Sequence, residues 1–228
     1  MNESHTSQKI LDFFSKYKKL DYKKGETLIH GEDEPQGIYY LTKGYVRMFL
    51  ITPDGKELTL NIFKPSSYFP MIWAIADIPN AYYYEAITAI EVIRAPKSDV
   101  LTKLVTNDQE VLFELTRRIM VGMDGLLTRI QYLLTADAHQ RVVSVIVMLT
   151  KRFGESKKDQ IFIDIPFTHQ EIANLAGLTR ETTSLELKKL KDKKLIYRKG
   201  KIWVVNGIDK LVEESLIFFN ENSLTNTF

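Results

Sequence analysis

The chain has 228 residues, and its 44% of hydrophobic residues can build a packed core in one large or two ordinary domains. It contains no cysteine, which excludes disulfide bonds, thiolate-ligated zinc and cysteine-held iron–sulfur clusters. The net charge of +2 conceals an asymmetry: residues 1–135 hold 16 Lys and Arg against 17 Asp and Glu, whereas residues 136–206 hold 14 against 8. The C-terminal part is therefore expected to meet a polyanionic partner.

Neither the N-terminal residues nor the apolar runs predict secretion or insertion into a membrane. Residues 1–5 are polar and do not resemble a secretory signal, and no apolar run reaches the ~20 residues that span a bilayer. We expect a cytoplasmic protein that makes no contact with membranes.

Residues 21–95 predict a β-rich domain, because β-like runs alternate there with turn signals. The runs lie at residues 26–30, 37–41, 45–52, 56–63 and 82–93. Short strands at this spacing favour a β-sandwich or jelly roll. Asp54-Gly55, between two alternating runs, predicts a hairpin.

From residue 107 the hydrophobic period becomes helical. Across residues 112–133, apolar residues recur at alternating spacings of four and three residues, and Thr116 occupies one of these positions. This spacing is typical of a coiled-coil seam. The expected dimer seam consists of Leu112, Ile119, Met123, Leu126, Ile130 and Leu133. The alternative is one long helix that buries this stripe on its own β-domain.

The segment that follows links this helix to a second domain. Asp137 is expected to cap a helix over residues 140–152. A surface loop at 154–159 and a strand at 161–165 come next. A further helix is expected at 209–220, followed by a frayed tail at 222–228.

Residues 168–190 have the features of a helix-turn-helix. Thr168 and Glu171 form a capping box at the start of the first helix. Gly177 can take a left-handed conformation at the turn without steric cost, and Thr179 can cap the second helix.

The second helix predicts DNA recognition. Its N-terminal end would present Arg180, Glu181 and Ser184, where a recognition helix meets base edges in the major groove. Arg pairs bidentately with guanine, Glu accepts from cytosine N4, and Ser can donate or accept. Paired half-sites require a twofold-symmetric protein. The predicted DNA recognition therefore favours a dimer seam on the long helix over burial of its apolar stripe on the β-domain.

The residues after this helix predict a basic wing. Two β-runs flank Lys199-Gly200, and residues 188–201 hold eight basic residues against one acid. Such a stripe neutralises phosphates without reading sequence, and helix starts can donate to phosphate as well. A solvated Lys-rich helix face is the alternative reading of the stripe alone. The expected phosphate contacts are Thr168, Thr179, Lys188, Lys189, Arg198, Lys199 and Lys201.

The order of these parts resembles the CRP/FNR family of bacterial transcription regulators, over almost the whole chain. The specific motifs are residues 37–46 (GIYYLTKGYV), 54–57 (DGKE) and 179–182 (TRET). The resemblance implies an α+β fold with an N-terminal β jelly-roll sensor domain, a long dimerisation helix and a C-terminal winged helix-turn-helix. The corresponding domains would be residues 1–106, 107–136 and 137–228.

The resemblance also implies a homodimer that binds pseudo-palindromic double-stranded DNA, an effector in the β-roll, and RNA polymerase as a partner. One reading position departs from the family, which often has Arg where this chain has Leu185. Leu cannot form a hydrogen bond with a base, although it can pack on a thymine methyl group. The operator sequence is therefore left open.

The cyclic-nucleotide site of the resemblance is degenerate. Members that bind cyclic nucleotides carry a Gly-Glu pair for ribose and an Arg-Ser or Arg-Thr pair for phosphate, which the matching residues 66–73 and 80–85 lack. No basic residue lies between Lys64 and Arg94, and a buried phosphodiester without a cation is strongly destabilised. Leu126-Leu127 replace the pair that would meet adenine. We do not expect cyclic AMP as the effector.

Three alternatives are open for the β-roll. It can hold a neutral or apolar ligand, fill its interior solidly, or bind haem or a metal. The four histidines are scattered and form no chelating pair, so we expect no metal and no cofactor. The candidate pocket residues are Phe69, Met71, Trp73, Tyr82, Tyr83, Tyr84 and Leu126.

Two other classes of protein compete with a regulator. A cupin-like enzyme would need converging histidine and carboxylate ligands, but the β-region contains only His30, and no catalytic motif occurs elsewhere. We therefore expect no enzyme. A ligand-binding adaptor whose winged helix contacts protein is disfavoured by the basic stripe beside Arg180 and Glu181.

Overall fold

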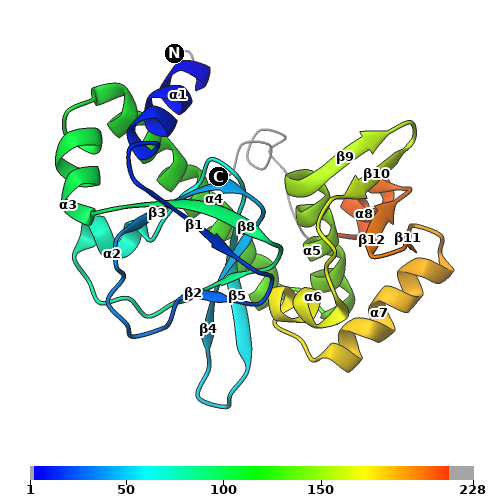
Figure 1. Cartoon of the computed structure of the whole chain (residues 1–228). Helices are drawn as coiled ribbons and strands as arrows, with labels where there is room; N and C mark the ends of the chain where they lie inside the picture. Colours follow the sequence, from blue (N-terminus) through cyan, green and yellow to red (C-terminus); the bar gives the residue numbers. More distant parts are fainter. Residues whose placement is uncertain (1–2, 216–228) are drawn as a thin grey trace. The chain divides into compact units, whose positions relative to one another are not determined.

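The computed structural model describes residues 3–215 (Figure 1). Their contacts divide into two compact units, one up to Ile119 and one from Met120, and helix α4 (Gln109–Thr135) contributes to both. An antiparallel β-domain, a long helix and helix-turn-helix elements follow one another, which confirms the predicted α+β fold class. Within the described residues, no helix is both long and apolar enough to cross a membrane.

The first unit is built on two antiparallel four-stranded sheets. One sheet has the order β1 (Lys18–Tyr22), β8 (Ile90–Ala95), β3 (Ile38–Lys43) and β6 (Tyr68–Phe69). The other has the order β2 (Thr27–Ile29), β7 (Tyr83–Ala86), β4 (Val46–Ile51) and β5 (Glu57–Phe63). The predicted β4–β5 hairpin is confirmed, and Gly55 takes the left-handed conformation at its turn with φ +79°.

Strand β3 separates two hydrophobic cores. Because side chains alternate across a strand, Tyr39 and Leu41 face the core between the sheets, whereas Ile38 and Tyr40 face a second core. This second core also contains Ile10 of α1 (Glu3–Phe14). All four strand residues are consequently buried, and β3 is covered on both faces.

The predicted strand at residues 82–93 is wrong as a single element. The structure divides it into β7 in one sheet and β8 in the other. At the break, the backbone N–H of Ile87 donates to the Tyr45 carbonyl at 3.0 Å, and the Thr88 hydroxyl accepts from the Tyr45 N–H at 3.0 Å. These contacts fix the point at which the chain leaves one sheet for the other.

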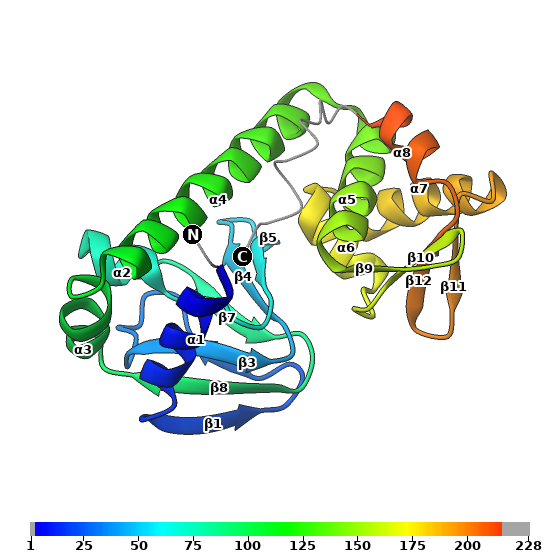
Figure 2. The same ribbon diagram turned by 90° about the horizontal axis from the view of Figure 1, so that it is seen from above.

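Helix α2 (Met71–Ala76) lies between β6 and β7. Helix α3 (Lys97–Asp99) and the π-helical η1 (Val100–Val105) lead from β8 to α4, and Figure 2 shows α4 as one uninterrupted helix. At the start of α4, the Asp108 carboxylate accepts the N–H groups of Glu110 at 3.0 Å and Val111 at 3.2 Å. This cap satisfies amides that have no partner within the helix.

The second unit begins with α5 (Ala138–Phe153), whose predicted Asp137 cap is confirmed as a capping box with Gln140. Its sheet has the order β11 (Ile196–Lys199), β12 (Ile202–Val205), β10 (Gln160–Ile163) and β9 (Gly154–Lys157). The prediction of a surface loop at 154–159 is therefore wrong, because β9 pairs with β10 in a hairpin. The last described helix is α8 (Ile208–Glu214). The rest of the expected helix to residue 220, and the tail, lie outside the described residues.

Candidate nucleic-acid interface

The helix-turn-helix consists of α6 (His169–Ala176) and α7 (Arg180–Asp192). The Thr168 side chain accepts the Glu171 N–H at 3.1 Å, and the Glu171 carboxylate accepts the Thr168 N–H, so the predicted capping box is confirmed. Gly177 lies in the left-handed region with φ +63°, and Thr179 accepts the Thr182 N–H at 3.2 Å. Local sequence therefore determines both helix starts and the turn between them.

Helix α7 is amphipathic, and its N-terminal end is open to solvent. Leu187 and Leu190 are completely buried and fix the inner face of the helix. Arg180 and Glu181 are exposed in the first turn, whereas Ser184 is half-buried. The structure thus brings the three predicted base-reading residues together at the start of one helix.

The wing lies next to this helix start. Its strands β11 and β12 join at Gly200, which has φ +63°. The fully buried Trp203 donates its indole N–H to the Phe167 carbonyl at 2.7 Å. Arg198 donates to the same carbonyl at 3.1 Å, and its guanidinium lies 4.9 Å from the Trp203 ring centre. Backbone and aromatic contacts therefore hold this exposed cation in place.

An open cleft of about 630 Å³ joins α6, α7 and the wing. It is lined by Thr168, His169, Gln170, Arg180 and Arg198. Two permanent guanidinium charges and the amide end of α6 make this cleft suited to an anion. Phosphate is the anion that such a surface meets on duplex DNA.

Burial lowers the pKa of His169, and the nearby cations Lys191, Arg198 and Arg180 lower it further. The His169 imidazole is therefore neutral at pH 7. Its Nδ1 lies 2.7 Å from the Ser184 hydroxyl oxygen. The sequence does not predict this contact, because Ser184 lies fifteen residues away and no local pattern joins them.

The remaining phosphate candidates lie on the wing, on α7 and at the starts of α6 and α7. Lys199 and Lys201 are exposed on the wing, and Lys188 and Lys189 are exposed on α7. Lys189 also forms an ion pair with Glu186 at 2.7 Å while its side chain stays 60% exposed. Thr168 and Thr179 already accept backbone amides, and the Thr179 hydroxyl also lies 3.0 Å from the Thr182 hydroxyl, so a phosphate contact at either residue would use its hydroxyl proton.

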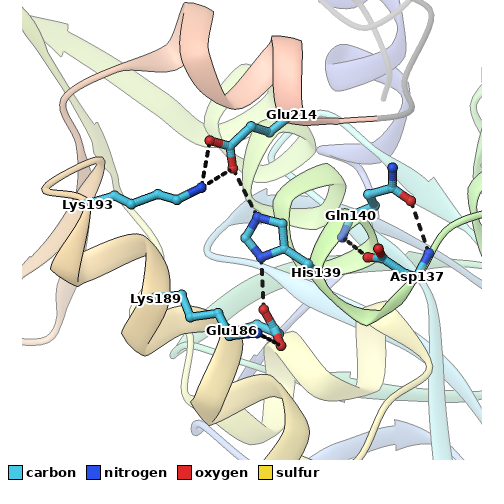
Figure 3. Close-up of polar contacts among 7 residues, drawn as sticks. All are labelled: Asp137, His139, Gln140, Glu186, Lys189, Lys193 and Glu214. Atoms are coloured by element: carbon cyan, nitrogen blue, oxygen red, sulfur yellow. Dashed lines mark hydrogen bonds and ion pairs between the residues drawn. The ribbon is translucent and has the colours of Figure 1, made fainter.

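A chain of hydrogen bonds and ion pairs supports the back of the recognition helix (Figure 3). His139 of α5 contacts Glu186 of α7 through Nδ1 at 2.8 Å and Glu214 of α8 through Nε2 at 2.9 Å. Lys189 and Lys193 continue the chain, at 2.7 Å from Glu186 and 2.8 Å from Glu214. The chain joins three helices that lie up to 75 residues apart in sequence, and sequence reasoning missed it.

The β-roll candidates are not brought to one place. Phe69 and Tyr84 are 1% and 2% exposed in the core between the sheets, and their ring centres lie 5.2 Å apart in a stack. Met71 and Trp73 pack against the other core, and the Lys97 ammonium lies 4.6 Å above the Trp73 ring. Tyr82 packs beside the inter-sheet core, and Tyr83 stacks on Phe49 at 5.2 Å.

Helix α4 presents its apolar stripe to solvent. Leu112, Ile119, Met123, Leu126 and Ile130 are 41–50% exposed, and Leu133 is half-buried beside Gly177. A second stripe at seven-residue spacing was not predicted, and it consists of Phe113, Met120, Leu127 and Leu134, which are 49–78% exposed. A large exposed apolar surface of this kind marks an interaction face.

Two family models match the chain in the order of its units. The model for the cyclic nucleotide-binding domain matches residues 19–107, and the model for the Crp-like helix-turn-helix domain matches residues 140–213. The two matches fall on the β-roll and on the helix-turn-helix with its wing.

Curated relatives and solved structures agree with these matches. The global nitrogen regulator of Nostoc sp. is 28% identical over 77% of this chain and 79% of its own, and the regulator ArcR of Staphylococcus haemolyticus is 29% identical over 81% and 80%. The c-di-GMP responsive regulator CLP of Xanthomonas campestris superposes with a TM-score of 0.74 at 21% identity, over 90% of this chain and 99% of that one. A CRP/FNR-family regulator of Thermus thermophilus gives 0.70 at 21%, over 87% and 98%, and these two structures show the shared fold. With both domain models in one chain and regulators as its relatives, the protein belongs to the CRP/FNR family of transcription regulators.

Proposed function

We propose that this regulator binds a pseudo-palindromic operator as a homodimer, with α7 of each protomer in the major groove. The observation that carries the proposal is the exposed N-terminal end of α7, where Arg180, Glu181 and Ser184 lie together beside the cationic cleft. Arg and Glu at such a position can read a G·C pair from its two bases, because guanine presents acceptors and cytosine an amino donor. Leu185, 62% exposed, is placed to pack on a thymine methyl group.

The basic residues around this end supply the phosphate contacts. Arg198 and Arg180 lie in the cleft, and Lys199 and Lys201 extend the positive surface along the wing. Lys188 and Lys189 add charge on α7, and Thr168 and Thr179 can donate at the two helix starts. These contacts fix the register of α7 on the duplex and make binding steeply dependent on salt.

The exposed stripe of α4 supports the homodimer. In a monomer, five apolar seam residues at 41–50% exposure would stay in contact with water along 19 residues of helix. Packing against the same stripe of a second copy removes this surface from water, as in a two-stranded coiled coil. A helix that buried the stripe on its own domain would not leave these residues exposed. The dimerisation segment is residues 107–136, between a sensor domain at 1–106 and a DNA-binding domain at 137–228.

Cyclic AMP does not control this regulator in our proposal. A relative from Mycobacterium tuberculosis, 24% identical, is a cAMP-activated regulator, but this chain has no cation between Lys64 and Arg94 for the phosphate. The stacked Phe69 and Tyr84 favour a filled roll over a ligand box at those two positions. Control by a neutral or apolar ligand and action without any effector are the two remaining modes. The regulator acts in the cytoplasm, with RNA polymerase as its partner.

A binding selection from genomic fragments at two salt concentrations, with the purified protein and no ligand, tests this function. Recovery of a two-half-site palindrome supports it, and millimolar cyclic AMP should then leave the operator affinity unchanged. An affinity that rises with cyclic AMP would contradict the effector proposal alone. Weak binding that is equal for all sequences would contradict the proposed operator recognition, and binding to protein instead of DNA would identify an adaptor.

A further inference from the structure

We propose that His169 is a specificity-determining residue, because it fixes whether the Ser184 hydroxyl donates or accepts a hydrogen bond at the base that it meets. The inference rests on the proposed function, since it concerns the same face of α7 on the same DNA. His169 itself lies on α6, outside the recognition helix.

The geometry joins the two helices at one side-chain contact. His169 is the first residue of α6, and its Nδ1 lies 2.7 Å from Oγ of Ser184 in the second turn of α7. The imidazole also lies against the Trp203 ring, with the centres 5.7 Å apart and the planes at 30°. Trp203 is fully buried and bonded to the Phe167 carbonyl, so it gives the imidazole a rigid support. The hydroxyl of Ser184 is therefore held by a fixed partner.

The protonation state of the imidazole decides the direction of this bond. A neutral imidazole has one N–H and one lone pair. His169 lines the open cleft, and Nε2 has no partner among the described residues, so Nε2–H can donate a hydrogen bond to water or to a phosphate in the cleft. Nδ1 then carries the lone pair and accepts a hydrogen bond from the Ser184 hydroxyl.

A hydroxyl that donates to His169 has only lone pairs left for a base. In the major groove it can then accept from the amino group of adenine N6 or cytosine N4, but it cannot donate to thymine O4 or guanine O6. His169 thus turns a serine that could bind any base edge into an acceptor. One position of each half-site is read through a residue that need not touch the base.

Protonation of His169 in acid reverses the direction of its hydrogen bond with Ser184. The charged groups that act on His169 are all cations: Arg180 and Lys191 from α7 and Arg198 from β11, while Trp203 of β12 is neutral. Together with burial they lower the pKa of His169, which keeps the ring neutral at pH 7.5. In the imidazolium, Nδ1 must donate, so the Ser184 hydroxyl can donate a hydrogen bond to the base and the preference moves to thymine or guanine.

The test is a selection from random duplex DNA with the full chain at pH 7.5. It compares the parent with His169→Phe, His169→Ala, Ser184→Ala and the double variant His169→Phe/Ser184→Ala. His169→Phe keeps a ring against Trp203 and removes the hydrogen bond to Ser184. It therefore tests the bond even if His169→Ala fails to fold. The parent should prefer adenine or cytosine at one position of each half-site by roughly three- to tenfold, the value of one hydrogen bond. His169→Phe should reduce this preference to about twofold or less and leave the other positions unchanged. In the Ser184→Ala background the histidine substitution should change nothing at that position.

A series of selections at falling pH separates a role in reading from a structural role. As His169 takes up a proton, the parent should move toward thymine or guanine at the same position, and His169→Phe should not move. If His169→Phe weakens binding to all sequences equally and keeps the preference, His169 is only a phosphate contact or a packing residue, and the proposal is overturned. If the parent itself recovers no operator at pH 7.5, the proposed function fails first and removes this inference with it.

Discussion

Arg180 is the first residue of α7, exposed on the cleft that the wing completes. At this place a guanidinium can reach guanine O6 and N7 with two parallel hydrogen bonds. Thr179, which caps the helix immediately before it, holds the backbone in position. Arg180 is therefore expected to supply both affinity and sequence discrimination.

Replacing Arg180 with Ala should weaken binding to the operator by about 1–3 kcal/mol and relax specificity at one base pair of each half-site. Titration of the operator and of a duplex changed at that base pair measures both effects. A variant that binds its operator as tightly as the parent would show that α7 does not read bases through this residue.

Lys199 differs from Arg180 in what it can recognise. It is exposed on β11, with its ammonium 5.6 Å from the Phe162 ring centre, and its point charge has no paired donor geometry for a base. Phosphate contact without base discrimination is the expected role.

The Lys199→Ala variant should lose affinity for operator and unrelated DNA to the same extent. The slope of log affinity against log salt should become less steep by about one unit. Binding isotherms at several salt concentrations measure the slope, and Lys103→Ala in η1 is the matched control. A change in base preference at any position would contradict the phosphate assignment.

At the scale of secondary-structure elements, the polar contacts of Figure 3 join the recognition helix α7 to α5 and α8. Glu186 has only 10% of its side chain exposed and contacts both His139 and Lys189. Burial raises the pKa of Glu186, but the hydrogen bonds from Lys189 and His139 outweigh it and lower the pKa overall. Hydrogen bonds from Lys193 and His139 likewise lower the pKa of Glu214.

These lowered pKa values predict how stability depends on pH. A carboxylate whose pKa is lower in the folded state stabilises the fold above its unfolded pKa of 4.5, and this contribution is lost as the pH falls through the folded value. Glu186→Gln should therefore reduce the free energy of unfolding by about 1–3 kcal/mol at pH 7, and the difference should shrink below pH 4.5. Urea unfolding at pH 7 and in acid measures it, with Glu213→Gln on the exposed side of α8 as the control. An equal difference at both pH values would show that charge is not the cause.

The α4 seam allows a sharp comparison between adjacent residues. Ile130 lies on the seam and Gln131 directly beside it, and both are exposed in the single chain. Ile130→Lys puts like charges opposite each other in a dimer, whereas Gln131→Lys adds the same charge off the seam. Sedimentation should show a monomer only for Ile130→Lys, and binding to a two-half-site operator should fall by at least about tenfold because twofold avidity is lost. If both variants stay dimeric, another surface forms the dimer.

At the scale of the whole molecule, one helix joins the two domains of the family. The two domains differ in how many of the family's sequence features they retain. The helix-turn-helix keeps the capping box at Thr168, the cap at Thr179 and the turn glycine. The β-roll keeps its strand order around a core of stacked aromatic rings, without a cation where a cyclic nucleotide would need one. In our proposal, the regulator combines a DNA-reading helix-turn-helix with a sensor domain whose signal differs from cyclic AMP.

The sequence by itself determined the features that depend on neighbours within four residues or on a regular period. The caps at Thr168, Thr179 and Asp137 and the turn at Gly177 were predicted, because each follows from one backbone conformation and one nearby amide. Only the tertiary structure decided the contacts between distant residues. The division of residues 82–93 has no Gly or Pro to mark it, because it depends on the partner strands. The polar edge strand β9 shows no alternation, since its conformation comes from pairing with β10. The bonds of His169 to Ser184 and of His139 to Glu186 and Glu214 exist only because packing places these helices side by side, which no local pattern encodes.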